Sequence, residues 1–191
     1  VGAQPRLAAE ERLALLDHSG AALQEEHLCT QGKGLLFPIV EKGQQEAASA
    51  LFGRAAELAP GYSCGFAGAG HSLAPQALLT PDAHGSAALL EQALVMAGRA
   101  QALAPKDGWA ISAVAWASFA NGDYEKAGEL SKLSEQLSPR DGNVLDFHGA
   151  ISVLTGDYAE ARRATDPSRE RDTSGLSHAN RNVYGVASFH A

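Results

Sequence analysis

Residues 104–108 of the chain read APKDG, and the similar stretch SPRDG follows at residues 138–142, which is 34 positions later. A second landmark keeps the same interval, because NGDY at residues 121–124 returns as TGDY at residues 155–158. Two landmarks that share one spacing indicate an internal repeat with a period of 34 residues.

The landmark residues are suited to the ends of helices. Proline cannot continue a helix, so Pro105 and Pro139 should follow two helix ends. Asp107 and Asp141, two positions after these prolines, can cap the helix that follows. Gly122 and Gly156 can adopt the left-handed conformation that closes a helix. The repeat therefore predicts a helix, a tight turn, a second helix and a proline stop.

The composition favours the same fold class. Of the 191 residues, 45% are hydrophobic and only 6% are aromatic. Alanine dominates the hydrophobic residues, and it is both the best helix former and small enough to let helices pack closely. We therefore expect an all-α chain that folds as a right-handed α-solenoid of antiparallel helix pairs.

A unit of helix, turn and helix with this period resembles the tetratricopeptide repeat (TPR). Residues 50–62, ALFGRAAELAPGY, are similar to the TPR region that lies C-terminal to bacterial class III adenylate cyclase domains and behind winged-helix regulators. The resemblance extends over roughly residues 27–191 and implies a TPR-like superhelix in the regulatory region of a signalling protein. We find no cyclase or winged-helix segment in this chain, so the resemblance assigns it neither activity.

The repeat landmarks divide the chain into segments. In order, we expect an N-terminal helical cap or degenerate repeat (1–26), four TPR-like repeats (27–60, 61–105, 108–141 and 142–165), a linker (166–176) and the first helix of a truncated final repeat (177–191). Within the first two segments, separate helices are predicted over residues 7–16 and 23–37. The second repeat exceeds the usual period, and a loop over residues 75–85 accounts for the surplus.

The candidate binding residues follow from the geometry of stacked helix pairs, because first helices line the concave face of a solenoid. The predicted groove residues are Trp109, Ser112, Trp116, Phe119, Asn143, Asp146 and Asn182, with Ala150, Val153 and Phe189 at further inward positions. Exposed aromatic rings beside hydrogen-bonding groups are typical of peptide grooves. Trp116 and Phe119 fit equally well into the core between helices, and Trp109 could also be buried.

No chemistry beyond binding is expected. Cys29 and Cys64 are too few for a disulfide framework, and we interpret them as free thiols of a reducing, cytoplasmic compartment. Structural zinc sites need closely paired ligands such as C-x-x-C, so we expect no metal and no other cofactor. The glycines of residues 65–70 do not follow the dinucleotide-binding pattern and favour close helix packing. No cluster of acid–base residues can be assembled, so an enzyme is not expected.

The charge narrows the class of partner. A formal net charge of -7 disfavours nucleic acid, whose phosphates require Lys and Arg. No apolar run approaches the roughly 20 residues of a membrane span. The leading hypothesis is a scaffold that binds a protein or peptide in its concave groove. The alternative is an oligomerisation module, in which the terminal repeats pack against a second chain as a homodimer.

Overall fold

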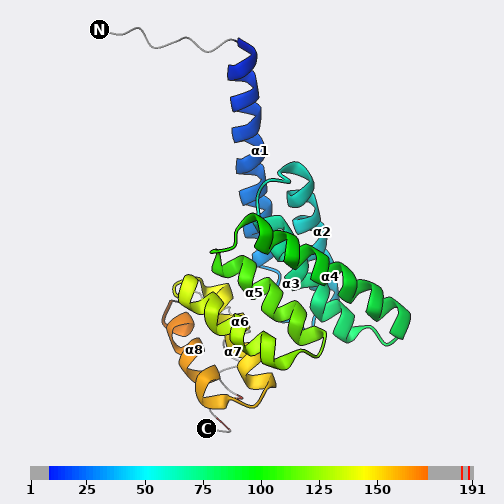
Figure 1. The fold of residues 1–191 in the computed structure, drawn as a ribbon, viewed down its shortest axis with the longest axis vertical. Helices are drawn as coiled ribbons and strands as arrows, with labels where there is room; N and C mark the ends of the chain where they lie inside the picture. The colour runs from blue at the N-terminus through cyan, green and yellow to red at the C-terminus, as the bar shows by residue number, and fades with distance from the viewer. Residues whose placement is uncertain (1–8, 172–185, 187–188, 190–191) are drawn as a thin grey trace.

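Eight α-helices make up the described part of the chain (Figure 1). The computed structural model describes the backbone of residues 9–171, 186 and 189, and the side chains of residues 20, 22–165, 186 and 189. The helices are α1 (Ala9–Lys33), α2 (Lys42–Leu58), α3 (Cys64–Leu79), α4 (Ala83–Leu103), α5 (Gly108–Ala120), α6 (Tyr124–Leu137), α7 (Gly142–Leu154) and α8 (Tyr158–Arg171). The described residues contain no β-strand, which confirms the all-α prediction. None of the described helices is long and apolar enough to cross a membrane.

Consecutive helices pack as antiparallel pairs, and the pairs follow one another along the molecule (Figure 1). The first helices of neighbouring pairs touch, so that α1 contacts α3, α3 contacts α5, and α5 contacts α7. Each second helix contacts its own partner and the first helix of the next pair. This regular progression is the packing of an α-solenoid.

The repeat landmarks have the roles that their positions predict. The Asp107 and Asp141 carboxylates accept hydrogen bonds from the backbone N–H groups of Trp109, at 3.1 Å, and Asn143, at 2.9 Å, and so cap α5 and α7. The backbone φ angles of Gly122 and Gly156 are 83° and 85°, in the left-handed region that closes a first helix.

Small side chains lie where helices meet. The fully buried alanines that mark these contacts include Ala48, Ala55, Ala93, Ala100, Ala115, Ala127 and Ala161. Gly68 of α3 packs against the ring of Phe52 so closely that a Cβ atom there would overlap the ring. The abundance of alanine and glycine therefore reflects short distances between helix axes.

Three predicted boundaries differ from the structure. The two helices predicted over residues 7–16 and 23–37 are one helix, α1, of 25 residues, which runs across the boundary placed after residue 26. No proline interrupts this stretch, and Gly32 lies so close to the Phe52 ring that a Cβ atom there would overlap it. The long N-terminal part of α1 extends away from the other helices (Figure 1).

The loop predicted over residues 75–85 is also mostly helical. Pro75 lies inside α3, which continues to Leu79, and α4 already begins at Ala83. The surplus residues of the second repeat therefore form extra turns, since α3 and α4 have 16 and 21 residues against 13 and 14 in α5 and α6. Burial of Pro75 between neighbouring elements stabilises a residue that the isolated helix would disfavour.

The described residues include only part of the predicted linker and the predicted last helix. Helix α8 runs to Arg171, so the first half of the predicted linker over residues 166–176 is helical. The remainder of that linker, and the predicted last helix over residues 177–191 apart from Val186 and Phe189, lie outside the described residues.

The connection between α1 and α2, residues 34–41, lies against the first helices. Leu36 is buried, and its carbonyl accepts a hydrogen bond of 2.8 Å from Gln45 Nε2 at the start of α2. The ring of Phe37 lies 4.8 Å, centroid to centroid, from that of Phe147 on α7. We call residues 34–41 the covering segment, because it occupies the face that the first helices of a solenoid would otherwise present.

Candidate binding pocket

Most of the predicted groove residues lie in the core. Trp109 is 3% exposed and stacks on the imidazole of His71 at a centroid distance of 4.1 Å, while Lys33 Nζ lies 4.3 Å from the Trp109 ring centroid. Ser112 and Asp146 are also buried. These side chains are therefore not exposed on an open groove.

The remaining predicted residues occupy varied positions. Trp116 is also in the core, at 1% exposed, and the partly buried Phe119 stacks almost parallel to it, with the ring centroids 5.4 Å apart. Asn143 is partly buried in the first turn of α7. Asn182 lies outside the described residues. The structure thus joins Trp116 to Phe119, and separates this pair from Trp109, which belongs to the stack around His71.

The burial has a specific cause. The last turn of α1 and the covering segment lie over α5 and α7, and the Phe147 ring contacts Phe37, His71, Trp109 and Trp116. Burial lowers the pKa of His71 well below its usual range, and the positive charge of Lys33 lowers it further. His71 is therefore a neutral imidazole that packs between the rings of Trp109 and Phe147.

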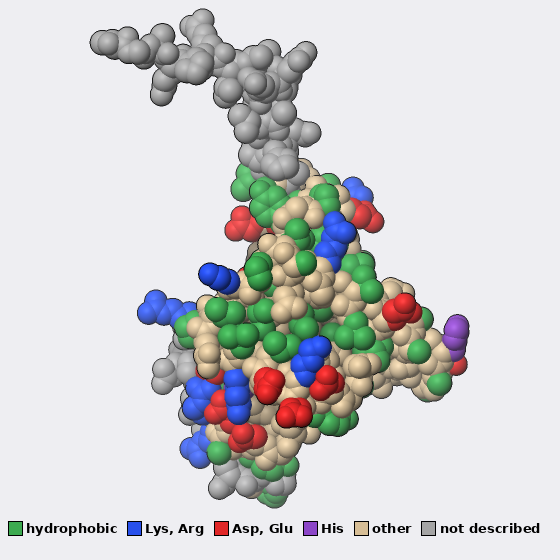
Figure 2. Space-filling model, viewed as in Figure 1, with side chains coloured by type: hydrophobic (Ala, Val, Ile, Leu, Met, Phe, Trp, Pro, Cys, Tyr) green, Lys and Arg blue, Asp and Glu red, His purple; other side chains and the backbone are tan. Residues whose placement is uncertain are grey.

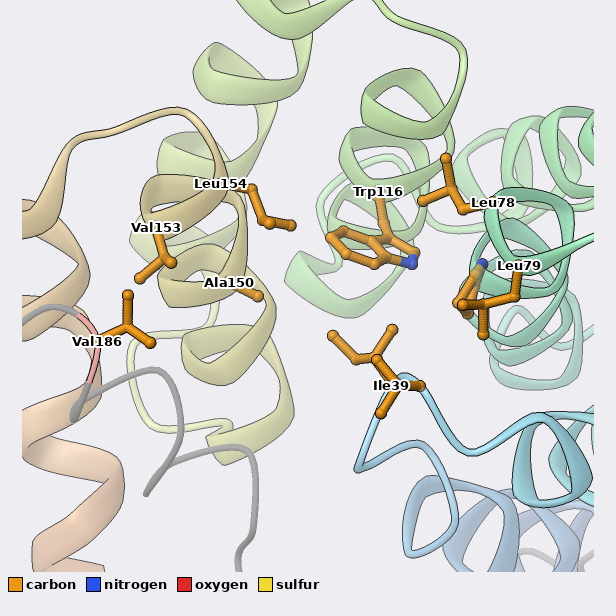
Figure 3. A pocket seen from close by; sticks show the side chains of 10 residues that line it. Ile39, Leu78, Leu79, Trp116, Ala150, Val153, Leu154 and Val186 are labelled. Atoms are coloured by element: carbon orange, nitrogen blue, oxygen red, sulfur yellow. The ribbon is translucent and has the colours of Figure 1, made fainter.

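An apolar pocket remains open beside the covered region (Figure 3). Its volume is about 460 Å³, and its lining side chains are Ile39 and Val40 of the covering segment, Pro75, Leu78 and Leu79 of α3, Trp116 of α5, Ala150, Val153 and Leu154 of α7, and Val186. Figure 3 shows Trp116 between the end of α3 on one side and α7 on the other. The lining residues that the structure describes include no titratable side chain.

The sequence indicated only part of this pocket. Trp116, Ala150 and Val153 were expected on the inward face, and all three line the pocket. The sequence does not indicate Leu78 and Leu79, because it predicts a loop over residues 75–85, whereas both leucines lie at the end of α3. The covering segment was missed because its position depends on contacts with α7, more than one hundred residues away. An apolar Leu-Leu pair directly before a turn was the one local signal for the α3 side.

A charged cluster joins α6, α7 and α8 away from this pocket. Arg163 donates hydrogen bonds to both oxygens of Glu135, at 3.0 and 2.6 Å, and to both oxygens of Glu160, at 2.7 Å each. His148 Nε2 lies 2.9 Å from Glu160 Oε1. These bonds from Arg163, with a smaller contribution from His148, lower the pKa of Glu160 to about 2. Figure 2 shows acidic and basic side chains interleaved over this corner of the molecule.

Among the side chains that the structure describes, two groups have the composition of metal ligands. Glu135, His148 and Glu160 form one group, but Arg163 already occupies its carboxylates by pairing with both of them. Glu25, Cys29 and Cys64 form the other group, at the contact of α1 with α3. The two cysteines are free thiols and belong to different helix pairs. Sequence spacing gave no indication that they would meet.

The comparisons with known proteins identify the class of fold. The structure is similar to that of a thermophilic TPR protein from Thermus thermophilus, with a TM-score of 0.55 and 17% identity over 86% of this chain and 99% of that one. MamA from Desulfovibrio magneticus RS-1 aligns at a TM-score of 0.45 and 20% identity, over 78% of both chains. A tetratricopeptide repeat protein from Parabacteroides merdae aligns at 0.46 and 17% identity, over 88% of this chain and 60% of that one.

No protein-family model and no curated protein sequence matches the chain. At such low identity the likeness defines the fold alone, and only the Thermus thermophilus protein aligns with a TM-score above 0.5 among these three. The fold is a TPR solenoid. Any statement on a partner has to come from the chain's own surface.

Proposed function

We propose that the chain is a protein-interaction scaffold that binds an apolar segment of a partner protein in the pocket between α3, α5 and α7. The pocket carries this proposal, because exposed apolar side chains converge on it. Val40 is 69% exposed, Leu78 52% and Leu154 58%. Contiguous apolar surface of this kind marks interaction sites on proteins of otherwise polar surface.

The chemistry of the lining defines the partner segment. A volume of about 460 Å³ with wholly apolar walls suits one or two aliphatic or aromatic side chains rather than a charged group. Trp116 lines the pocket but is only 1% exposed, so the exposed side chains of Leu78 and Leu154 supply the accessible contact surface. The apolar character of the described lining residues supports a role in binding.

Peptide selection tests the proposal directly. Peptides selected from a random display library on the full chain should be rich in apolar residues, and their affinity should be measured by calorimetry. Leu78→Lys should weaken binding by about tenfold or more, because a buried charge in an apolar site is unfavourable. Val95→Lys is the control, since Val95 is an exposed apolar residue of α4 that does not line the pocket. Equal affinity of both variants would sink the proposal.

Self-association is a second candidate use of the same surface. Val186 lines the pocket, and Phe189 is 85% exposed close by in the sequence. A second copy could bury these side chains and form a homodimer. Sedimentation equilibrium over a wide concentration range separates the two functions. A chain that remains monomeric at all concentrations does not self-associate, which excludes the homodimer. A dimer that Leu78→Lys dissociates would favour self-association.

The wider setting is also a proposal. The resemblance of residues 50–62 to regions behind cyclase and winged-helix domains supports a regulatory role in bacterial signalling. The acidic net charge of -7 supports a protein partner rather than nucleic acid. The reduced thiols Cys29 and Cys64 support a cytoplasmic location. Sequencing of the surrounding reading frame tests the signalling role, since it reveals which domain is encoded beside this one.

A further inference from the structure

Two thiols and a carboxylate meet where α1 packs against α3. Glu25 and Cys29 lie one turn apart on α1, and Cys64 is the first residue of α3. The two Sγ atoms and a carboxylate oxygen of Glu25 all lie within 4.8 Å of one another. The Cys29 thiol donates a hydrogen bond of 3.1 Å to Glu25 Oε1, and the Gly65 N–H donates one of 3.3 Å to the same oxygen. Helices from two successive repeats therefore build one compact group.

The group is largely buried, and no ion pair among the described residues joins it to a positive charge. Glu25 is 5% exposed and Cys29 is 3% exposed, whereas Cys64 is partly exposed. Among the described residues, the ion pairs of the molecule join other carboxylates and leave Glu25 with hydrogen-bond donors alone. Burial of a carboxylate is costly when no cation accompanies it. A bound cation would remove this cost.

We propose that Glu25, Cys29 and Cys64 bind a thiophilic divalent cation, with Zn²⁺ as the representative ion. Thiolate sulfur and carboxylate oxygen are both established zinc ligands. Zinc–sulfur bonds of about 2.3 Å in a tetrahedral site place two sulfurs about 3.8 Å apart, which the observed grouping accommodates. Three protein ligands leave one position for water, and the partial exposure of Cys64 gives that position access to solvent.

Binding exchanges protons for metal and involves no oxidation. The S–H bonds of Cys29 and Cys64 break, two metal–sulfur bonds form, and two protons pass to solvent. The hydrogen bond with Cys64, burial, and the nearby Glu25 carboxylate raise the pKa of the Cys29 thiol. Metal affinity should therefore rise with pH.

The test uses the reduced full chain with Co²⁺ as a spectroscopic probe and Zn²⁺ as competitor. We expect one Co²⁺ per chain with thiolate-to-metal charge-transfer absorption, which Zn²⁺ displaces. Because the chain has only two cysteines, this absorption reports on Cys29 and Cys64 alone. Cys64→Ser and Glu25→Gln should each weaken Zn²⁺ binding by about 100-fold or more, above the loss typical of supporting residues.

Glu26→Gln is the matched control, because Glu26 is the exposed neighbour of Glu25 on α1 and should leave affinity unchanged. Cys64→Ser alters a partly exposed position, so the test stands even if a change at buried Cys29 unfolds the chain. The proposal is overturned if the reduced wild type shows no charge-transfer absorption, or if Cys64→Ser and Glu25→Gln retain wild-type affinity. It is equally overturned if the two thiols form an intramolecular disulfide in air while the reduced chain binds no Zn²⁺.

Discussion

Lys33 and Asp141 are 108 residues apart in the chain, yet Lys33 Nζ lies 3.4 Å from Asp141 Oδ2. Lys33 ends α1, and Asp141 caps α7 through its other carboxylate oxygen, Oδ1. The same ammonium group lies over the Trp109 ring of α5. One side chain thus joins the first helix pair to the third and fourth, and holds the end of α1 over the face of the first helices.

Lys33→Met should lower the free energy of unfolding by about 0.5–1.5 kcal/mol, since it removes one ion pair and one cation–π contact of partly buried groups. Asp141→Ala should cost about 1 kcal/mol more than that, because it also removes the cap of α7. Urea denaturation measures both. Lys42→Met is the control, because its pair with Glu46 is largely exposed. Equal losses for Lys33→Met and Lys42→Met would contradict the prediction.

His71 should make the fold sensitive to mild acid. Its pKa is lowered in the folded chain by burial and by Lys33, whereas the unfolded chain takes up a proton near pH 6.5. The unfolded state therefore binds more protons as the pH falls below 6.5, and the fold loses stability in that range. Between about pH 7.5 and about pH 5, His71→Leu should reduce this loss by about 1–2 kcal/mol.

Urea denaturation at the two pH values measures the effect of His71→Leu. His84→Leu serves as the control, because His84 is exposed at the start of α4 and its replacement should leave the pH dependence unchanged. If His71→Leu and the wild type lose equal stability on acidification, His71 is not the responsible group.

Glu160 should dominate a second transition at lower pH. Its pKa of about 2 in the folded chain is below the ordinary value of 4.5, because Arg163 and then His148 hydrogen-bond to the carboxylate. Its contribution is therefore present above about pH 4.5 and is lost as the pH falls towards 2. After allowance for solvent screening this contribution is about 1–2 kcal/mol.

Arg163→Met should flatten the stability profile between about pH 5 and about pH 2, because the folded carboxyl then titrates closer to its ordinary pKa. Arg54→Met, which disrupts an exposed pair with Glu57, should leave the profile unchanged. Thermal denaturation followed by circular dichroism across this range measures both. A profile of Arg163→Met that overlays the wild type would rule out the assigned role of Glu160.

Gly68 of α3 and Gly98 of α4 should respond in opposite ways to replacement by alanine. At Gly68 a methyl group would overlap the ring of Phe52, so Gly68→Ala should destabilise the fold by about 1–3 kcal/mol. At Gly98, inside α4, no atom lies within 4 Å of the added methyl, so Gly98→Ala should stabilise it by about 0.5–1 kcal/mol. Chemical denaturation of the two variants measures their free energies of unfolding. A Gly68→Ala variant more stable than the wild type would show that α2 and α3 pack less closely than described.

The amino-acid sequence by itself determined the helical repeat and the ends of its helices. Proline after a helix, aspartate at a cap and glycine at positive φ act within a few residues of their own positions, so Pro105, Asp107 and Gly122 reveal their roles without tertiary contacts. The sequence also predicts the small residues at helix contacts, because they recur with the period of the repeat.

Only the tertiary structure decided which faces of the first helices remain open. Phe37 reaches Phe147, and Cys29 reaches Cys64, through the stacking of separate helix pairs, which no spacing within one repeat encodes. Pro75 is helical for a related reason, since burial against neighbouring elements outweighs its local preference. Trp109 lies in the core because the end of α1 folds over it, and the open pocket is what this covering leaves exposed.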